Sequence, residues 1–229
     1  WYYDWSRPSD VSVKKTLNLK PIAIIPARGN SKRLPRKNIL PWKGTPLIGH
    51  SIKNAIASNV FSEVIVSSED DEILSYAKEC GAKTIKRNDK LSKDTSTVVE
   101  VCADIINDFD RLEYFCCIYA TAVKLSAKTI QNSFTEFNRM PNCDFLMGVS
   151  LYNYPPQQAL IKNEFGNLIL MNPEFKGVQS QQFKDCFVSN GTLYWANTKS
   201  FLKEKSFYGA SLQPFVVSEK EDIVSAPRR

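Results

Sequence analysis

Residues 21–38 read PIAIIPARGNSKRLPRKN, and the change of character inside this stretch decides the fold. Its first part is a short apolar run, which predicts a buried β-strand. The strand leads directly into a basic loop that contains Gly29, a residue type that lets the backbone approach a ligand closely. In α/β proteins, ligands collect beyond the carboxyl ends of the parallel strands. The stretch therefore predicts an α/β fold with a ligand site directly after its first strand.

The loop holds a local excess of positive charge. From Arg28 to Lys43 the chain has six cations and no acidic residue, while its formal net charge is +6. The rest of the chain is nearly balanced, which favours a small polyanion over nucleic acid, because nucleic-acid binders spread their cations over a face or a helix. Backbone N–H groups, forked arginine donors and lysine charges together predict a triphosphate cradle. The alternative is a solvated basic loop or a localisation-type basic run.

The chain after the loop alternates between helix and strand patterns. Thr97 and Glu100 have the spacing of a capping box, and Ser126 is a predicted N-cap. Pro46 suits a first helical turn, and Gly81 suits a helix end. The alternation predicts a parallel sheet with helices on both faces. The predicted helices are 46–58, 70–81, 97–109 and 126–138, and the predicted strands are 63–68, 82–86 and, in the centre, 114–120.

After residue 140 the pattern changes to mostly strands. A hairpin is predicted at 158–171, with its turn near 164–167. We interpret this half as completing the sheet and adding a small β excursion at about 150–190. Its apolar and aromatic content makes the excursion a candidate subunit interface. The other predicted elements are a strand at 143–150, a strand followed by a helix within 191–205, and a late strand at 214–218.

The composition is that of an ordinary globular protein, with 43% hydrophobic and 24% charged residues. The length predicts a single domain at 21–229. Residues 1–20 have no apolar core of signal-peptide type. We expect them to form a poorly ordered arm, which is interpreted as a tag remnant, a fragment edge or a docking arm. Because no run of about 18 apolar residues occurs, we expect no transmembrane helix and no membrane partner.

Six cysteines lack Cys-x-x-Cys spacing, and five of them lie in apolar or periodic stretches. We interpret them as reduced core residues of a cytoplasmic protein, because disulfides are rare in that compartment. A zinc site is not expected, since His50 is the only histidine. For the same reason a Ser-His-Asp or Cys-His hydrolase is poorly supported. The cysteines are Cys80, Cys102, Cys116, Cys117, Cys143 and Cys186.

Residues 24–39, IIPARGNSKRLPRKNI, resemble the signature of the CMP-sialic acid synthetases, the acylneuraminate cytidylyltransferases. The resemblance extends over about residues 21–224. Further segments similar to family stretches are EVIVSSEDDEILSYAKECGA at 63–82, KRNDKLSKDTSTVVEV at 86–101 and NGTLYWA at 190–196. The segments most like the pseudaminic acid branch are CCIYATA at 116–122, YPPQQAL at 154–160 and SQQFKDCFVSNGTLYW at 180–195.

The resemblance implies a Rossmann-like nucleotidyltransferase fold and a reaction. The family transfers CMP from CTP to the anomeric hydroxyl of a nine-carbon keto-sugar acid and releases pyrophosphate. By this resemblance, Arg28 and Lys37 are the catalytic cations that spread the charge building on the phosphates. Arg87 and Ser92 would contact the cytosine or its ribose. The full nucleotide-binding set implied is Ala27, Arg28, Gly29, Ser31, Lys32, Asn38, Arg87 and Ser92.

The resemblance also implies a sugar site built from neutral hydrogen-bonding residues. Family members specific for the common sialic acid carry a Gln at the position of Tyr119 and cations near Gln157 and Ser180. This chain lacks them, which favours a different nonulosonic acid. It also has Ala120 and Val123 where the family has proline, so the sugar loop is expected to differ. The implied sugar-binding residues are Tyr119, Thr121, Gln157, Gln158, Gln181 and Asn190.

The end of the chain departs from the family pattern. The family carries Asp-x-Asp, whose carboxylates bind Mg²⁺, and an acidic terminal helix. Asp222 matches the first Asp, Val224 stands at the second, and Glu221 or Glu219 is a further candidate ligand. Two rival functions stay open: another sugar-phosphate or Kdo nucleotidyltransferase, and a homologue that binds CTP without turnover. By resemblance we also expect a homodimer, formed through PPQQALIKNEFGNLILM at 155–171.

Overall fold

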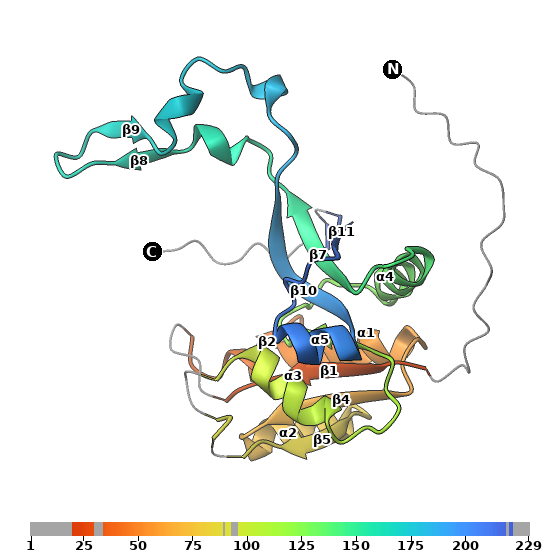
Figure 1. Cartoon of the computed structure of the whole chain (residues 1–229). Coiled ribbons are helices and arrows are strands. Elements are labelled where there is room, and N and C mark those ends of the chain that lie inside the picture. Colours follow the sequence, from red (N-terminus) through yellow and green to blue (C-terminus); the bar gives the residue numbers. More distant parts are fainter. Residues whose placement is uncertain (1–19, 30–33, 89, 93–95, 219, 222–229) are drawn as a thin grey trace.

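The structure is a computed structural model that describes residues 20–29, 34–88, 90–92, 96–218 and 220–221. Its centre is a seven-stranded sheet with the strand order β11-β7-β10-β6-β1-β4-β5 (Figure 1). Strands β6, β1, β4 and β5 run parallel, β10 runs antiparallel to β6 and β7, and β11 is parallel to β7. The strands are β1 (Ile22–Pro26), β4 (Glu63–Ser68), β5 (Lys83–Lys86), β6 (Tyr114–Ile118), β7 (Phe145–Leu151), β10 (Phe187–Asn197) and β11 (Leu212–Val216).

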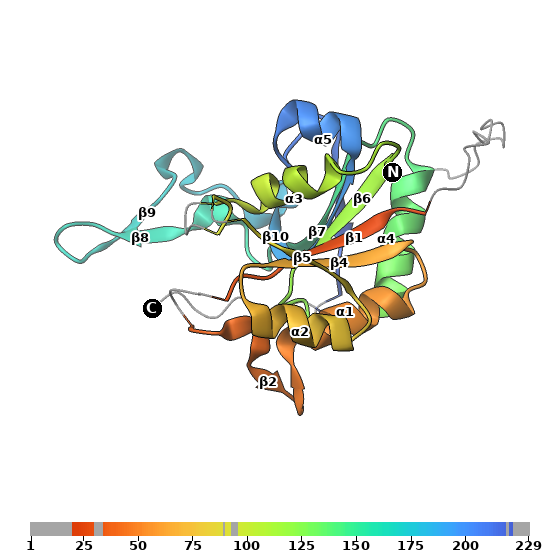
Figure 2. The same ribbon diagram turned by 90° about the horizontal axis from the view of Figure 1, so that it is seen from below.

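Helices cover both faces of this sheet, as the strand–helix alternation predicts (Figure 2). One apolar cluster joins α1, α2 and α4 to one face, and a second joins α3 and α5 to the other. Trp195 lies fully buried in the first cluster, where its indole N–H donates to Ser133 Oγ at 2.9 Å. The helices are α1 (Leu47–Ala57), α2 (Asp71–Glu79), α3 (Val98–Ile106), α4 (Ala127–Arg139) and α5 (Thr198–Glu204).

The predicted helix ends are confirmed at three helices. Thr97 and Glu100 form a reciprocal capping box at α3, and Ser126 Oγ accepts from Thr129 N–H at α4. Gly81, with φ +90°, ends α2, and Ala82 N–H bonds back to Ala77 O at 3.0 Å. This return bond is the Schellman arrangement. These local signals work because each satisfies backbone groups within one turn of the helix end.

Several element boundaries differ from the prediction. Residues 41–46 form an unpredicted hairpin of β2 (Pro41–Trp42) and β3 (Thr45–Pro46), turned by Lys43 and Gly44, both with positive φ. Pro46 therefore precedes the first helical turn instead of lying in it. Helix α3 ends at Ile106, before the predicted Phe109. Strand β10 starts at Phe187, because its amino-terminal part pairs with the end of β7 across a register shift.

The cysteine interpretation is right for half of the set. Cys102, Cys116 and Cys117 are buried, whereas Cys80, Cys143 and Cys186 are partly exposed. Burial raises the pKa of the Cys116 and Cys117 thiols well above its usual value. All six have free thiols.

The predicted β excursion is an arm that leaves the sheet between β7 and β10 (Figure 1). We call residues 152–186 the arm. Near its tip is the predicted hairpin, formed by β8 (Leu160–Lys162) and β9 (Leu168–Leu170) and turned at Gly166. Short 3₁₀ helices at Pro156–Gln158, Pro173–Phe175 and Ser180–Gln182 complete the arm.

Some predictions concern residues outside the described part of the chain. These are all but the last residue of the predicted N-terminal segment 1–20, the phosphate contacts of Ser31 and Lys32, and the metal ligand Asp222 with its neighbours Glu219 and Val224. Among the described residues, no helix is both long and apolar enough to cross a membrane.

Candidate functional site

The candidate site lies where the carboxyl ends of β1 and β4 meet. The two strands pair in register, with Pro26 opposite Ser67, and the next residue continues the pairing because Ala27 N–H donates to Ser67 O at 2.9 Å. The parallel register therefore brings Arg28 and Gly29 to the segment that follows β4. This is the edge at which an α/β sheet binds ligands.

Carboxylates from the β4–α2 junction face the basic loop. Gly29 N–H donates to Glu69 Oε1 at 2.7 Å. Arg36 forms ion pairs with Asp70, at 3.2 Å, and with Glu72. Asp70 also caps α2 by accepting from the backbone N–H groups of Glu72 and Ile73. The loop that lacks acids in sequence thus has acidic neighbours in space, so part of its charge is balanced within the protein.

Arg87 is an almost fully buried cation beside this junction. Its side chain is 7% exposed, Nη2 donates to Ser67 O at 2.8 Å, and Nη1 lies 3.7 Å from Glu69 Oε2. Burial lowers the pKa of Arg87 from its usual value, and the charge of Glu69 opposes that effect. The guanidinium is therefore held in one orientation by strand β4 and its following residue. A fixed cation of this kind suits an anionic ligand because its orientation is set before binding.

Asn38 and Lys37 enter the site through a 3₁₀ turn, η1 (Lys37–Ile39). Asn38 is buried, and its amide Nδ2 donates to Arg28 O at 2.8 Å. This bond ties the turn to the loop backbone next to Gly29. Ser92 lies in the connection between β5 and α3, where its hydroxyl donates to Asn88 O at 2.7 Å. Asn38 thus shapes the loop directly, whereas Ser92 stabilises its own turn.

Two of the predicted sugar-binding residues come together through Thr192, where β6 ends beside the irregular part of β10. Tyr119 follows β6, its N–H donates to Thr192 O at 3.0 Å, and its ring packs against Tyr194 at 5.3 Å between centroids. Burial raises the pKa of the Tyr119 hydroxyl above its usual value. Asn190 Oδ1 accepts from Thr192 Oγ1 at 2.7 Å, and its Nδ2 donates to Ser150 Oγ at 3.3 Å. Thr121 lies partly exposed in the turn after β6.

The three predicted glutamines lie together on the arm. Gln157 Nε2 donates to Cys186 Sγ at 3.2 Å, and its Oε1 is buried without a partner among the described residues. Gln158 links two arm segments, donating to Val178 O at 2.9 Å and accepting from Ser180 Oγ at 2.9 Å. Gln181 is exposed. The predicted sugar residues thus form two groups, one at the sheet and one on the arm.

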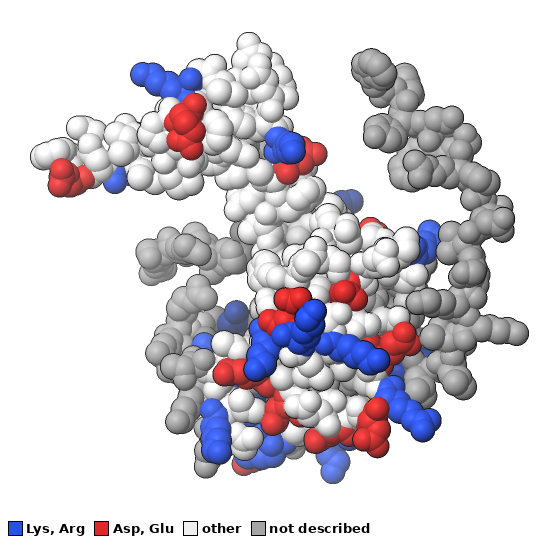
Figure 3. Space-filling view, in the orientation of Figure 1, with Lys and Arg blue, Asp and Glu red and all other residues white. Residues whose placement is uncertain are grey.

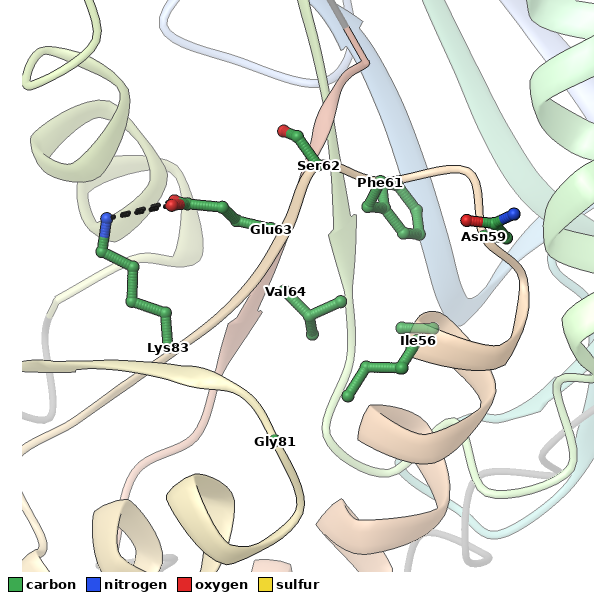
Figure 4. A pocket seen from close by; sticks show the side chains of 9 residues that line it. Ile56, Asn59, Phe61, Ser62, Glu63, Val64, Gly81 and Lys83 are labelled. Carbon is green, nitrogen blue, oxygen red and sulfur yellow. Dashed lines mark hydrogen bonds and ion pairs between the residues drawn. The ribbon is translucent and has the colours of Figure 1, made fainter.

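Two cavities lie away from the loop. Figure 4 shows the first, of about 340 Å³, at the amino ends of β4 and β5, with the ion pair of Glu63 and Lys83 at its rim. It lies at the amino ends of the strands, whereas Gly29 lies at the carboxyl ends, and it contains none of the predicted site residues. The second, of about 600 Å³, is on the arm and includes Gln158. Its lining residues are Tyr152, Tyr154, Pro155, Pro156, Gln158, Ala159 and Met171.

Glu69 is a site residue that the sequence does not identify, although adjacent parallel strands bring their carboxyl ends together and so place it beside the loop. Glu221 is expected only as a candidate metal ligand, and the structure shows another contact for it. Glu221 accepts from Ser126 N–H at 3.0 Å and from Thr129 Oγ1 at 2.6 Å. Burial raises the pKa of Glu221, but the hydrogen bonds from Ser126 and Thr129 outweigh it and hold that pKa below its usual value. No local sequence signal predicts this contact, which spans more than 90 residues.

The described carboxylates do not by themselves form a complete Mg²⁺ site. Within the described ranges, no group of three or more His, Cys, Asp and Glu side chains could hold a metal ion. Glu221 has both oxygens hydrogen-bonded at the start of α4, which orients its carboxylate toward that helix. One protein carboxylate is still compatible with Mg²⁺, which keeps several waters and binds substrate phosphates.

Comparison with known proteins shows which family the chain resembles. Residues 22–154 match a family model described as cytidylyltransferase. The chain is 33% identical over 204 residues to pseudaminic acid cytidylyltransferase of Campylobacter jejuni, covering 87% of this chain and 88% of the relative. It is 30% identical over 212 residues to CMP-N,N'-diacetyllegionaminic acid synthase of Legionella pneumophila, covering 88% and 90%.

A solved structure supports the same fold. CMP:2-keto-3-deoxy-manno-octonic acid synthetase complexed with CTP aligns with a TM-score of 0.64 and 14% identity, covering 86% of this chain and 90% of that one. At this identity the likeness concerns the fold alone. The predicted nucleotidyltransferase architecture, a mostly parallel sheet flanked by helices, is confirmed.

Proposed function

Because this chain belongs to the cytidylyltransferase family, we propose that it transfers CMP from CTP to the anomeric hydroxyl of a nonulosonic acid and releases pyrophosphate. Pseudaminic acid is the proposed acceptor, since the relative in Campylobacter jejuni is named for it. The observation that carries the proposal is the meeting of the basic loop with the buried Arg87 at the carboxyl ends of β1 and β4. That edge offers backbone N–H groups and fixed cations to a triphosphate.

The proposed chemistry is an attack of the anomeric hydroxyl oxygen on the α-phosphorus of CTP. The bond to the bridging oxygen breaks, the electron pair leaves with pyrophosphate, and the hydroxyl proton passes to water. Arg28 and Lys37 are proposed to stabilise the charge that builds on the phosphates, which is how most of the rate arises in such reactions. Asn38 supports them by holding the Arg28 carbonyl. The other proposed nucleotide contacts are Ala27, Gly29, Ser31, Lys32, Arg87 and Ser92.

Mg²⁺ is part of the proposal, held by Asp222 together with phosphate oxygens. When bound, it would neutralise charge on the phosphates of CTP. Glu221 anchors the chain directly before Asp222 to the N-terminus of α4. A cytoplasmic location is also proposed, and the six free thiols support it.

A homodimer formed through the arm is the proposed assembly. The hairpin of β8 and β9 exposes apolar side chains on both of its faces, and a lone two-stranded hairpin is marginally stable in water. Charged side chains are sparse on the arm in Figure 3 and dense on the body below it. An apolar projection of this size with few charges favours burial against a second copy. The exposed arm residues include Tyr154 (84%), Phe165 (79%), Leu168 (64%), Leu160 (56%), Met171 (49%), Ile161 (44%) and Ile169 (44%).

The sugar would bind through Tyr119, Thr121 and Asn190 at the sheet and through Gln157, Gln158 and Gln181 on the arm. Neutral donors and acceptors of this kind suit a polyhydroxylated, N-acylated sugar. Their division into two groups supports a site at which the arm and the sheet face the acceptor from different sides.

Pyrophosphate release tests the reaction. Purified protein with CTP and Mg²⁺ should release pyrophosphate with pseudaminic acid and less with N-acetylneuraminic acid, N,N'-diacetyllegionaminic acid or Kdo. Release only with Kdo would replace the proposed acceptor class.

Lys37→Ala should reduce turnover about 100-fold, the usual loss for one charge-stabilising group, with the melting temperature unchanged. Lys43→Ala is the matched control, since Lys43 lies over the Trp42 ring in the β2–β3 turn. Equal turnover in the Lys37→Ala and Lys43→Ala variants would exclude the catalytic role of Lys37.

A CTP-binding homologue without turnover is the second candidate, favoured by Val224 at the position of the second metal carboxylate. CTP binding without pyrophosphate release from any acceptor would support it. Val224→Asp should then restore release if the missing carboxylate is the cause.

A further inference from the structure

Glu69 makes a contact that competes with any anion bound by the basic loop. Its Oε1 accepts from Gly29 N–H at 2.7 Å, which is a short, charge-assisted hydrogen bond. Ala27 N–H points to strand β4, whereas Gly29 N–H points to a side chain. A phosphate oxygen that used this N–H would need the place that the carboxylate occupies.

The same carboxylate is the counter-ion of Arg87. Glu69 Oε2 lies 3.7 Å from Arg87 Nη1, and the Arg87 side chain is 7% exposed. The other side of the guanidinium is bound to Ser67, through Nη2 to the carbonyl at 2.8 Å and through Nε to the hydroxyl at 3.4 Å. Glu69 therefore neutralises two donors of one anion seat: a backbone N–H and a buried cation.

The hold of Glu69 on this seat is incomplete. Its Oε2 is buried but has no hydrogen-bond partner among the described residues. A buried polar atom left without a hydrogen bond costs free energy, so this position is less favourable than a fully bonded one. An anion that makes more hydrogen bonds at this position can therefore displace the Glu69 carboxylate.

Asp70, the neighbouring carboxylate, is fixed by contrast. Its Oδ1 caps α2, and its Oδ2 pairs with Arg36. It also packs against Gly29, where a Cβ would lie 2.5 Å from Asp70 Oδ2. Only a glycine fits there, so Asp70 holds the loop backbone in place while Glu69 occupies its N–H.

We propose that Glu69 is a resident anion that occupies the seat formed by Gly29 N–H and Arg87 and is displaced by the phosphate oxygens of the nucleotide. The inference rests on the proposed function only for the identity of the incoming anion. Glu69 then sets the affinity for metal-free nucleotide, because binding must first break two contacts. It also keeps the two donors neutralised and oriented when no ligand is bound.

The test is calorimetric binding of CTP and of inorganic pyrophosphate in EDTA, without acceptor. Glu69→Gln keeps the size of the side chain and removes its charge. It should lower the Kd of both anions about tenfold, because one like charge is removed from beside the bound anion. Asp71→Asn is the matched control, since Asp71 lies two residues away, is exposed and pairs with Lys86. It removes the same charge and should change Kd less than about twofold.

A second measurement uses the wild-type protein. The Gly29 amide resonance in ¹⁵N–¹H spectra should move on addition of pyrophosphate in EDTA, with the same Kd as in calorimetry. A Glu69→Gln variant that folds and binds CTP no tighter than wild type would overturn the proposal, as would a Gly29 resonance that stays in place while CTP binds. If neither wild type nor variant bound CTP or pyrophosphate, the proposed function itself would fail. If pyrophosphate bound tighter to Glu69→Gln and CTP bound to neither protein, the anion seat would stand and the nucleotide assignment would fall.

Discussion

Arg87 illustrates how much a single residue depends on its surroundings. By resemblance to the family it is a candidate contact for the cytosine or its ribose, and the structure shows that it also makes contacts within the protein. It joins the Ser67 carbonyl to the Glu69 carboxylate within a nearly closed environment. One residue thus links strand β4 to the acidic junction beside the loop.

Replacing Arg87 should therefore affect stability as well as binding. Arg87→Ala leaves Glu69 buried without its counter-ion and should lower the free energy of unfolding by about 2 kcal/mol, the scale of a hydrogen bond to a charged group. Chemical denaturation of the ligand-free protein measures this change. Lys86→Ala, which removes an exposed ion pair with Asp71, should stay within about 0.5 kcal/mol of wild type. If both variants were equally stable, the guanidinium would have no structural role.

Helix ends show what local elements contribute. At the start of α3, Glu100 Oε2 accepts from Thr97 N–H at 2.7 Å and from Thr97 Oγ1 at 3.1 Å. At the start of α4, the C-terminal segment supplies the acceptor, because Glu221 binds Ser126 and Thr129. The first arrangement is complete within four residues, whereas the second needs the whole fold.

The capping box predicts a pH dependence. The hydrogen bonds from Thr97 hold the pKa of Glu100 below its usual value. Because the pKa is lower in the folded state, this contribution is fully present above the unfolded pKa. It is lost as pH falls through the folded pKa, that is, from about 4.5 downward. Glu100→Gln should flatten the acid side of the curve of unfolding free energy against pH. Glu164→Gln, on the exposed turn of the arm, should leave that curve unchanged.

The contact of Glu221 predicts a local change in protection. Glu221→Ala removes the acceptor of the Ser126 N–H, so this amide should exchange with solvent faster, by about tenfold if the bond is worth roughly 1.5 kcal/mol. Hydrogen exchange followed by NMR measures it. Glu204→Ala, at the exposed end of α5, is the control. An unchanged Ser126 rate would show that Glu221 does not protect this amide.

On the scale of the whole molecule, the arm is the part whose apolar side chains are exposed on both faces of its hairpin. It leaves the sheet between β7 and β10 and exposes apolar side chains along its hairpin. In the proposed dimer these side chains lie against a second copy.

The assembly proposal predicts the mass in solution. Wild-type protein should have twice the single-chain mass of 26.0 kDa in light scattering. Leu168→Glu places a charge on the exposed face of β9 and should shift the protein to the single-chain mass, whereas Lys176→Glu should not. A wild-type mass of one chain at micromolar concentration would contradict the dimer.

Most of the sheet and its helices could be predicted from the sequence, because their signals are local. The apolar run before Gly29, the capping box at Thr97 and the stop at Gly81 each act within a few residues. The basic loop can also be recognised from the sequence, since six cations lie close together between Arg28 and Lys43. By itself, the sequence determined the α/β alternation and the position of the loop after the first strand.

Only the tertiary structure decided which acids face those cations. The contacts of Gly29 with Glu69 and of Arg36 with Asp70 join residues more than 30 positions apart. They exist because β1 and β4 pair in parallel with Pro26 opposite Ser67, and a different register would bring other side chains to the loop. The same holds for Glu221 at α4 and for the separation of the arm's glutamines from Tyr119. Strand register and chain crossings set these distances, and no short stretch of sequence encodes them.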